Sequence, residues 1–230
     1  MRYVYCHPLF DERKCAHRFS YQLKNAFEAA GRSLERFDYR GAGEATGDFC
    51  DISLDSLRAD IAQHIGAEQV CLIGLRFGAS LAFDYCTRGG KGVQTLVLLE
   101  PVVDGARYVD YLRRKQHIKN VLTGESSDAL REEGYENIEG YKTSWKFLEE
   151  IRKFNLVKEA QDRPPNNRVF IAQVSNGKKV GPEIARLADV LQRSAKKLSV
   201  ENIKLPVFWE RIPSTDYSKL TTKILRWCSD

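Results

Sequence analysis

The 230-residue sequence predicts an α/β protein with a doubly wound, mostly parallel sheet, in a single domain over 1–230. Short β-type runs alternate with helical segments, and parallel neighbouring strands require such crossover connections. The apolar run 70–73 leads through Gly74 and Gly78 into a good helix former at 79–83. This pattern is typical of a buried strand, a tight turn and a helix.

The first hundred residues contain four predicted strands and three predicted helices. The strands are the short apolar runs 3–6, 34–39, 70–73 and 95–99. The helices repeat apolar residues at helical spacing over 15–30, over 53–66 and from 79 onward. Ser53 is a suitable N-cap for the second helix, while Gly31 and Gly66 supply C-terminal stops. The loop 40–44 is rich in glycine, which favours a turn with unusual dihedral angles.

Glu100-Pro101 ends the fourth strand, and no strand is predicted over 102–163. Helical patterns within this stretch indicate an inserted helical cap, which we expect over the carboxyl edge of the sheet. After Pro164-Pro165 the pattern returns to strands and helices. The predicted strands are 169–174 and 207–209, and the predicted helices start at Pro182 and at Tyr217.

Arg76 lies at the centre of the turn Gly74-Leu75-Arg76-Phe77-Gly78. This spacing is that of the nucleophile elbow of α/β-hydrolases, where small residues let a strained central residue project above the sheet. Arginine cannot attack an acyl carbon, because its guanidinium stays protonated. The usual triad base would follow the last strand, but the four histidines are His7, His17, His64 and His117. A standard Ser-His-Asp triad is therefore not expected.

Three roles remain open for Arg76, one of them direct participation in catalysis. With the N-terminus of the following helix it can form a site for a carboxylate, a phosphate or an acyl group. Alternatively it is a structural residue that pairs with Glu100 or Asp38, because an unpartnered guanidinium in a partly buried cleft is costly. The predicted ligand-binding residues are Arg76, Phe77, Leu9 and Trp209.

Glu100 and His7 are the candidate catalytic residues. Glu100 follows the strand next to Arg76, where a carboxylate can act as acid or base or can be a salt-bridge partner. His7 lies where an oxyanion loop would begin, and it either donates to a ligand or braces the loop. Trp209 either forms a wall of an acyl pocket or closes the core.

Composition excludes several classes of protein. The net charge of +5 is modest and mixed, so nucleic-acid binding is not expected. No apolar run is long enough to span a bilayer, and the first residues lack an export signal, so we expect a cytoplasmic protein without membrane insertion. The six cysteines have no paired spacing, which favours reduced thiols over disulfides or zinc. No metal and no cofactor is predicted.

The order of motifs resembles the α/β-hydrolase-fold proteins associated with exosortase A systems, which are distant relatives of serine aminopeptidase-like hydrolases. The matching motifs are His7-Pro8-Leu9-Phe10, Asp38-Tyr39-Arg40-Gly41-Ala42-Gly43, Gly47-Asp48-Phe49, Gly74-Leu75-Arg76-Phe77-Gly78-Ala79, Pro101-Val102-Val103, Gly140-Tyr141 and Phe208-Trp209. Arginine is usual at the elbow of that family, whereas Glu100 departs from an expected glutamine. The resemblance implies an α/β-hydrolase fold, a bacterial source and a hydrolase named by its fold alone.

Three functional hypotheses follow. The first is a pseudoenzyme or binding protein that holds a small anionic or acylated ligand at Arg76. The second is a hydrolase or acyl transferase with displaced machinery, using water activated by Glu100 or His7. The third is a protein-interaction module of an exosortase-linked export or polysaccharide system, which predicts a large exposed apolar surface on the insertion. Oligomeric state is left open.

Overall fold

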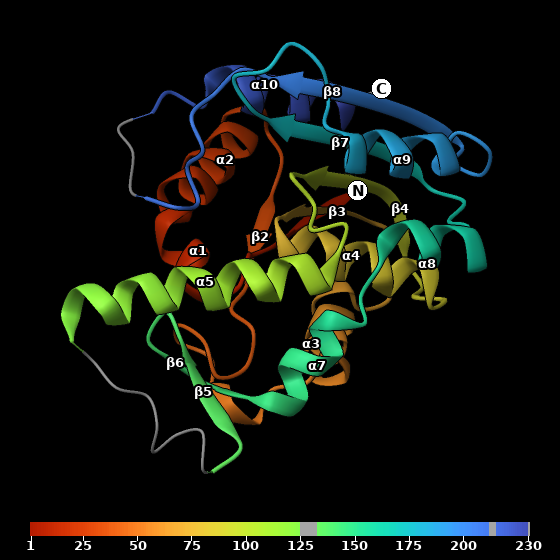
Figure 1. Cartoon of the computed structure of the whole chain (residues 1–230). Helices are drawn as coiled ribbons and strands as arrows, with labels where there is room; N and C mark the ends of the chain where they lie inside the picture. The colour runs from red at the N-terminus through yellow and green to blue at the C-terminus, as the bar shows by residue number, and fades with distance from the viewer. Residues whose placement is uncertain (125–132, 212–214, 230) are drawn as a thin grey trace. The chain divides into compact units, whose positions relative to one another are not determined.

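The computed structural model describes residues 1–124, 133–211 and 215–229 (Figure 1). The chain forms two compact units. The first consists of Met1–Phe37, Ile61–Val103 and Leu156–Asp230, and the second of Asp38–Asp60 and Asp104–Asn155. The helix α3 (Leu54–Ile65) begins in the second unit and ends in the first.

A six-stranded parallel sheet forms the centre of the first unit. Its strands are β1 (Arg2–Cys6), β2 (Leu34–Arg36), β3 (Val70–Leu75), β4 (Val93–Leu99), β7 (Arg168–Val174) and β8 (Lys197–Ile203). They lie in the order β2-β1-β3-β4-β7-β8, and every neighbouring pair is parallel. The predicted fold class, a doubly wound and mostly parallel sheet, is confirmed.

Helices cover both faces of this sheet. They are α1 (Phe10–Cys15), α2 (His17–Ala29), α4 (Phe77–Thr87), α8 (Leu156–Asp162), α9 (Pro182–Leu191) and α10 (Ser218–Trp227). Apolar residues of α2 and α10 share one core with the side chains that alternate strand residues present to that face, such as Tyr5 and Ile73. The helix α4 packs on β3 and β4, and α9 packs on β8. All six residues of β3 are buried, as expected for a parallel sheet covered on both faces.

The second unit contains η1 (Phe49–Asp51), α5 (Gly105–Thr123), the hairpin β5 (Tyr135–Ile138) and β6 (Tyr141–Ser144), and α7 (Trp145–Arg152). The prediction of no strand over 102–163 is therefore wrong. Glu139 and Gly140 have φ of 55° and 95°, which is the left-handed backbone of a two-residue hairpin turn. The two strands are short and largely polar, so they lack the apolar run on which the sequence prediction relied.

The predicted strand at 207–209 is also wrong. Phe208 and Trp209 are 0% and 4% exposed, yet residues 204–208 have no regular secondary structure. Their side chains are part of the core, but their backbone does not pair with a neighbouring strand. Pro206 lacks the N–H that such pairing requires. The last strand is instead β8, whose polar and apolar residues alternate from Lys197 to Glu201.

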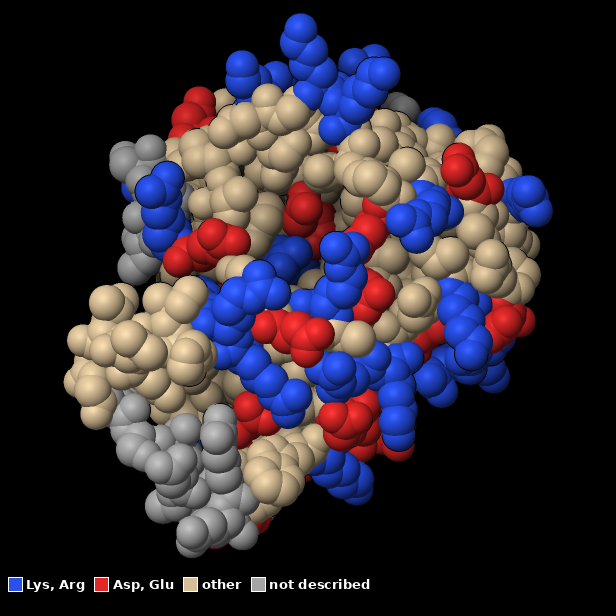
Figure 2. Space-filling model, viewed as in Figure 1, with Lys and Arg blue, Asp and Glu red and all other residues tan. Residues whose placement is uncertain are grey.

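No helix among the described residues combines the length and the apolar character needed to cross a membrane. Figure 2 shows acidic and basic side chains intermixed over the face in view, without separation into large patches of one sign.

Candidate functional site

Arg76 lies in a strained turn between β3 and α4. Its φ of 54° and ψ of −126° are unusual for a residue with a side chain, and it is the N-cap of α4. Its N–H donates to the carbonyl of Leu99 at the end of β4, at 2.9 Å, and its own carbonyl accepts the N–H of Ser80 at 3.2 Å. The neighbouring strand and the first turn of the helix thus hold the strained backbone in place.

Gly74 and Gly78 permit the close packing around this turn. A Cβ at Gly78 would lie 2.2 Å from the carbonyl oxygen of His7, and one at Gly74 would lie 2.4 Å from the Cα of Ala79. Both contacts are with backbone, which cannot rotate away. The glycines therefore bring α4 against β3 and against the end of β1.

The guanidinium of Arg76 is paired with Glu12, a residue that the sequence analysis did not select. Its Nε donates to Oε1 of Glu12 at 3.0 Å. The Glu12 side chain is 0% exposed and that of Arg76 15%, so this is a largely buried ion pair. Each charge offsets the desolvation of the other, so the removal of either one is costly.

The partners predicted for Arg76 were Glu100 and Asp38. The guanidinium reaches the backbone carbonyl of Glu100 at 3.5 Å through Nη1, a long contact. Asp38 belongs to the second unit, where its carboxylate accepts the N–H of Glu44 at 3.1 Å. Glu12 lies in the polar run 11–14, which resembles an exposed turn in the sequence. The sequence contained only an indirect signal for this partner, because a buried arginine requires a carboxylate.

Trp209 lies against the same guanidinium. The Cζ of Arg76 is 5.2 Å from the centroid of the Trp209 ring, a cation–π geometry. The ring also meets Phe208 edge to face at 5.1 Å. The tryptophan predicted to line a ligand site thus contacts the guanidinium of Arg76.

Glu100 directly follows β4 and has a left-handed φ of 42°. Its N–H donates to the carbonyl of Ala172 at 2.8 Å, and its Oε2 accepts the N–H of Val174 at 2.6 Å. Burial raises the pKa of this carboxyl above its ordinary value, and nearby Glu12 raises it further; the Val174 hydrogen bond and the Arg76 charge oppose the rise. A carboxyl with a raised pKa is suited to proton transfer.

The remaining predicted residues are buried. His7 is 4% exposed and its ring meets Tyr5 edge to face at 4.8 Å. Leu9, 3% exposed, is the N-cap of α1, and Phe77, 0% exposed, is the first residue of α4. The structure thus places Arg76, Glu100 and Trp209 together, with the His7 backbone against Gly78. The described residues contain no cluster of three His, Cys, Asp or Glu side chains that could hold a metal ion.

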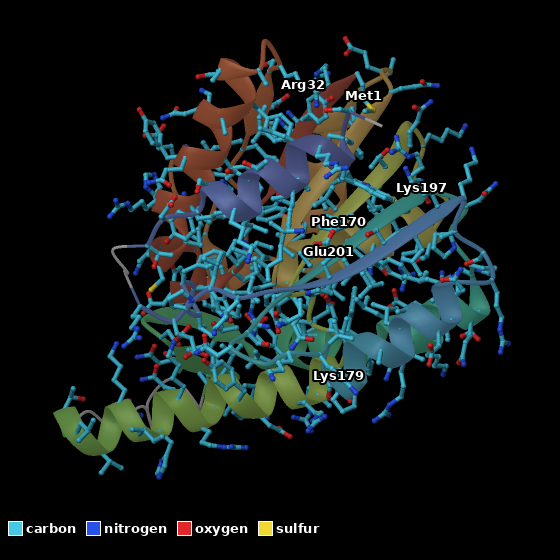
Figure 3. All side chains as sticks on the ribbon, turned by 90° about the horizontal axis from the view of Figure 1, so that it is seen from above. Met1, Arg32, Phe170, Lys179, Lys197 and Glu201 are labelled. Atoms are coloured by element: carbon cyan, nitrogen blue, oxygen red, sulfur yellow. The ribbon has the colours of Figure 1, made fainter. Side chains whose placement is uncertain are left out.

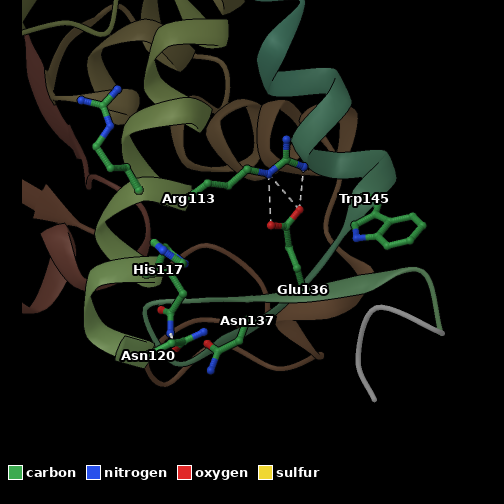
Figure 4. A pocket seen from close by; sticks show the side chains of 8 residues that line it. Arg113, His117, Asn120, Glu136, Asn137 and Trp145 are labelled. Carbon is green, nitrogen blue, oxygen red and sulfur yellow. Dashed lines mark hydrogen bonds and ion pairs between the residues drawn. The ribbon is translucent and has the colours of Figure 1, made fainter. Parts of the chain in front are cut away.

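The second unit has a cavity of its own, of about 610 Å³ (Figure 4). Its lining residues are Arg113, Arg114, Gln116, His117, Asn120, Glu136, Asn137 and Trp145. Arg113 and Glu136 face each other across it and form a forked ion pair, with the shortest N–O distance 2.6 Å. This ion pair forms part of the lining, which also contains Arg114 and His117.

The helix α5 exposes Ile118, Val121 and Leu122, which are 54%, 70% and 81% exposed. They are spaced i, i+3 and i+4 and so lie on one face of the helix. The interaction hypothesis predicts a large exposed apolar surface on the insertion; these three side chains lie there, and the interaction itself stays a prediction.

No protein-family profile matches the chain, and no curated protein sequence matches it. Solved structures do. Est1E from Butyrivibrio proteoclasticus, with ferulic acid bound, is 13% identical with a TM-score of 0.65, covering 99% of this chain and 89% of its own. The Pyrococcus furiosus esterase PF2001 is 12% identical with a TM-score of 0.66, covering 99% and 80%.

Mouse alpha/beta hydrolase domain-containing protein 10 is 14% identical with a TM-score of 0.62, covering 99% of this chain and 89% of its own. At such identities the likeness establishes the fold and not the reaction. The six parallel strands, the strand–turn–helix at Arg76 and these neighbours agree: the chain has the α/β-hydrolase fold.

Proposed function

We propose that this protein is a non-hydrolytic member of its fold class, which binds a small acyl or carboxylate ligand beside Arg76. The observation that carries the proposal is the strained backbone of Arg76, with φ 54°, at the position that corresponds to the nucleophile elbow. A non-glycine residue in such a conformation costs about 1–3 kcal/mol, and such strain is concentrated at functional sites.

The residue types support binding over covalent catalysis. A guanidinium has no lone pair with which to attack an acyl carbon. The last histidine of the sequence is His117, which precedes β7 and β8, so no histidine follows the last strand to act as a base. The neighbours named esterases and lipases therefore indicate the kind of compound to test, and not a shared mechanism.

The buried Glu12 narrows the ligand class. Its charge balances that of Arg76, and the Glu100 carboxyl lies beside the same guanidinium. A doubly charged phosphate would meet little net attraction there, whereas an acyl carbonyl or a single carboxylate needs only directed hydrogen bonds. In its protonated form Glu100 can donate its O–H to an acyl oxygen.

The test is a thermal-shift screen of short carboxylic acids, acyl amides and phosphate esters. The screen compares the wild type with the charge-neutral double variant Arg76→Met/Glu12→Gln. We expect an acyl or carboxylate compound to raise the Tm of the wild type and to leave that of the double variant unchanged. Arg168→Met is a matched control, since Arg168 also packs on a tryptophan, Trp227, at 5.1 Å. Equal shifts in wild type and double variant would overturn the proposal.

A second candidate function, ester hydrolysis, is supported by Glu100 alone. Its pKa is raised by burial, which favours a carboxyl that takes a proton from water during ester hydrolysis. His7, buried against Tyr5, is the weaker candidate base. Turnover of p-nitrophenyl esters that is lost in Glu100→Gln would support this function over pure binding. Turnover unchanged in both Glu100→Gln and His7→Ala would remove both roles.

A further inference from the structure

The two edges of the six-stranded sheet differ in length. β2, at one edge, has three residues, whereas β8, at the other, has seven and pairs with β7 alone. In a strand, half of the backbone N–H and C=O groups face each side, so β8 presents a row of them away from β7. Figure 3 shows β8 at the edge nearest the viewer, with α9 and α10 on its two sides.

β8 lacks two of the devices that protect an edge strand, a proline and a bulge, although it carries the charged residues Lys197 and Glu201. The sequence Lys-Leu-Ser-Val-Glu-Asn-Ile contains no proline and no glycine. Its pairing with β7 runs without a register shift from Lys197 to Ile203, so no bulge turns the strand away from a partner. Its residues from 198 to 202 are all half-buried, as expected for an edge that one neighbour covers.

Two copies of β8 that run antiparallel place complementary residues opposite one another. If two copies pair antiparallel about Ser199, Lys197 faces Glu201 of the other copy, and Leu198 faces Val200. Directly opposed residues share a face and interact, and opposite charges there are favourable. A two-fold axis at Ser199 would repeat each pair, giving two ion pairs and two apolar pairs.

Lys197 and Glu201 lie on the same face of the sheet, as the antiparallel pairing requires. Lys197, Ser199 and Glu201 are alternate residues and lie on one face of the sheet. On that face Glu201 pairs with Lys223 of α10, and the Lys197 ammonium lies 4.9 Å from the ring of Trp227. The Glu201 side chain is still 36% exposed beside Lys223, so it can also pair with Lys197 of a second copy. Figure 3 shows Lys197 and Glu201 at separate positions along β8.

We propose that β8 is a dimerisation edge, at which a second copy of this chain adds its own β8 antiparallel about Ser199. The two sheets then join into one continuous sheet. This inference does not depend on the ligand at Arg76, because it uses only β8 and α10.

Complementation between two charge reversals tests the register. Lys197→Glu and Glu201→Lys each place like charges opposite one another in both pairs of a homodimer. Either variant alone is expected to dimerise about tenfold or more weakly than the wild type in sedimentation equilibrium. An equimolar mixture of the two restores both pairs and is expected to give heterodimers. Since mixing changes no contact within a chain, recovery cannot reflect folding.

The controls lie just outside the strand. Lys204→Glu makes the same charge reversal at an exposed position that has no counterpart in this register, and it is expected to leave the dimer unchanged. A wild type that stays monomeric at its highest soluble concentration would overturn the proposal. So would a dimer that Lys197→Glu and Glu201→Lys do not weaken, because it would use another surface.

A cross-link provides a second measurement if a charge variant folds poorly. Ser199→Cys places two thiols opposite one another at the two-fold axis, where opposed Cβ atoms lie about 4.5–5.5 Å apart. Mild oxidation is expected to join 199 to 199 between chains, as identified by mass spectrometry. Lys204→Cys is the matched control and should not cross-link. Absence of the 199–199 link in a dimeric sample would contradict the register.

Discussion

The ion pair between Arg76 and Glu12 is the feature on which both the stability and the site geometry depend. The Glu12 side chain is fully buried and that of Arg76 is 15% exposed, so the carboxylate depends on protein partners whereas the guanidinium keeps a small exposed surface. A buried pair contributes little compared with an apolar pair of the same size, but removing one partner is costly. The pair therefore holds the guanidinium in place more than it stabilises the fold.

Glu12→Gln is predicted to lower the free energy of unfolding by about 3–5 kcal/mol, because it leaves the Arg76 charge without its carboxylate. The double variant Arg76→Met/Glu12→Gln should lose less than Glu12→Gln alone. Urea denaturation of the three proteins measures this. Asp11→Asn, which breaks an exposed pair with Lys14 on the same helix, is the control and should cost at most about 1 kcal/mol. Similar losses for Glu12→Gln and Asp11→Asn would contradict the prediction.

The raised pKa of Glu100 predicts a pH dependence of stability. The unfolded chain ionises this carboxyl near its ordinary value of about 4.5, whereas the folded chain keeps the proton to higher pH. Between the two pKa values the folded state binds more protons, so stability falls as pH rises through this window. Glu100→Gln removes the group and keeps an acceptor for the Val174 N–H.

The variant Glu100→Gln should therefore gain stability relative to wild type as pH rises above about 4.5, and the gain should level off above the folded pKa. Thermal unfolding of both proteins across this pH range measures the difference. A difference that is independent of pH would show that the pKa of Glu100 is the same in the folded and unfolded chains.

At the scale of elements, the turn from β3 to α4 is determined by the backbone contacts of its glycines. Gly78→Ala is predicted to destabilise the protein by about 1–3 kcal/mol or more, because its Cβ would meet two backbone carbonyls of residues 6 and 7. Gly177→Ala is a matched control, since its Cβ would lie 3.3 Å from the nearest atom, the side-chain hydroxyl of Ser175, and would meet no backbone closer than 3.6 Å. Chemical denaturation of both variants compares them, and equal stabilities would contradict this account of the turn.

The elements also show what the sequence could predict. The strands of the sheet centre were found because full burial produces continuous apolar runs, as in β3. β8 was missed because an edge strand is half-buried and alternates, and the apolar run containing Phe208 and Trp209 was taken for the last strand instead. Apolar character reports burial, which a loop packed into the core shares with a strand.

The candidate site was predictable in part for a similar reason. Gly74, Arg76 and Gly78 are neighbours in the sequence, so their spacing alone indicated a turn centred on arginine. Glu12 is 64 residues from Arg76 in a charged run, and only the tertiary fold buries it. Local sequence patterns thus identified the turn, but they did not identify Glu12, the side chain that pairs with Arg76.

At the scale of the whole molecule, the burial of the six cysteines predicts how many thiols react in the native protein. All six are free thiols: Cys6, Cys71 and Cys228 are buried, and Cys15, Cys50 and Cys86 are partly exposed. Burial raises the pKa of Cys71 well above its ordinary value, and its Sγ lies 3.7 Å from that of Cys228. A thiol must be reached and ionised to react, so the buried group should be inert.

Titration of the native protein with a disulfide reagent should therefore modify at most three thiols, and titration in denaturant should modify six. Among the partly exposed thiols, Cys50 and Cys86 should react more slowly than an ordinary exposed cysteine, because desolvation raises the pKa of both, and Asp51 adds to the rise at Cys50. Mass spectrometry of the partly modified protein assigns the sites. Modification of Cys71 or Cys228 as rapid as that of Cys15 would mean that the core formed by α2, α10 and the sheet opens in the native protein.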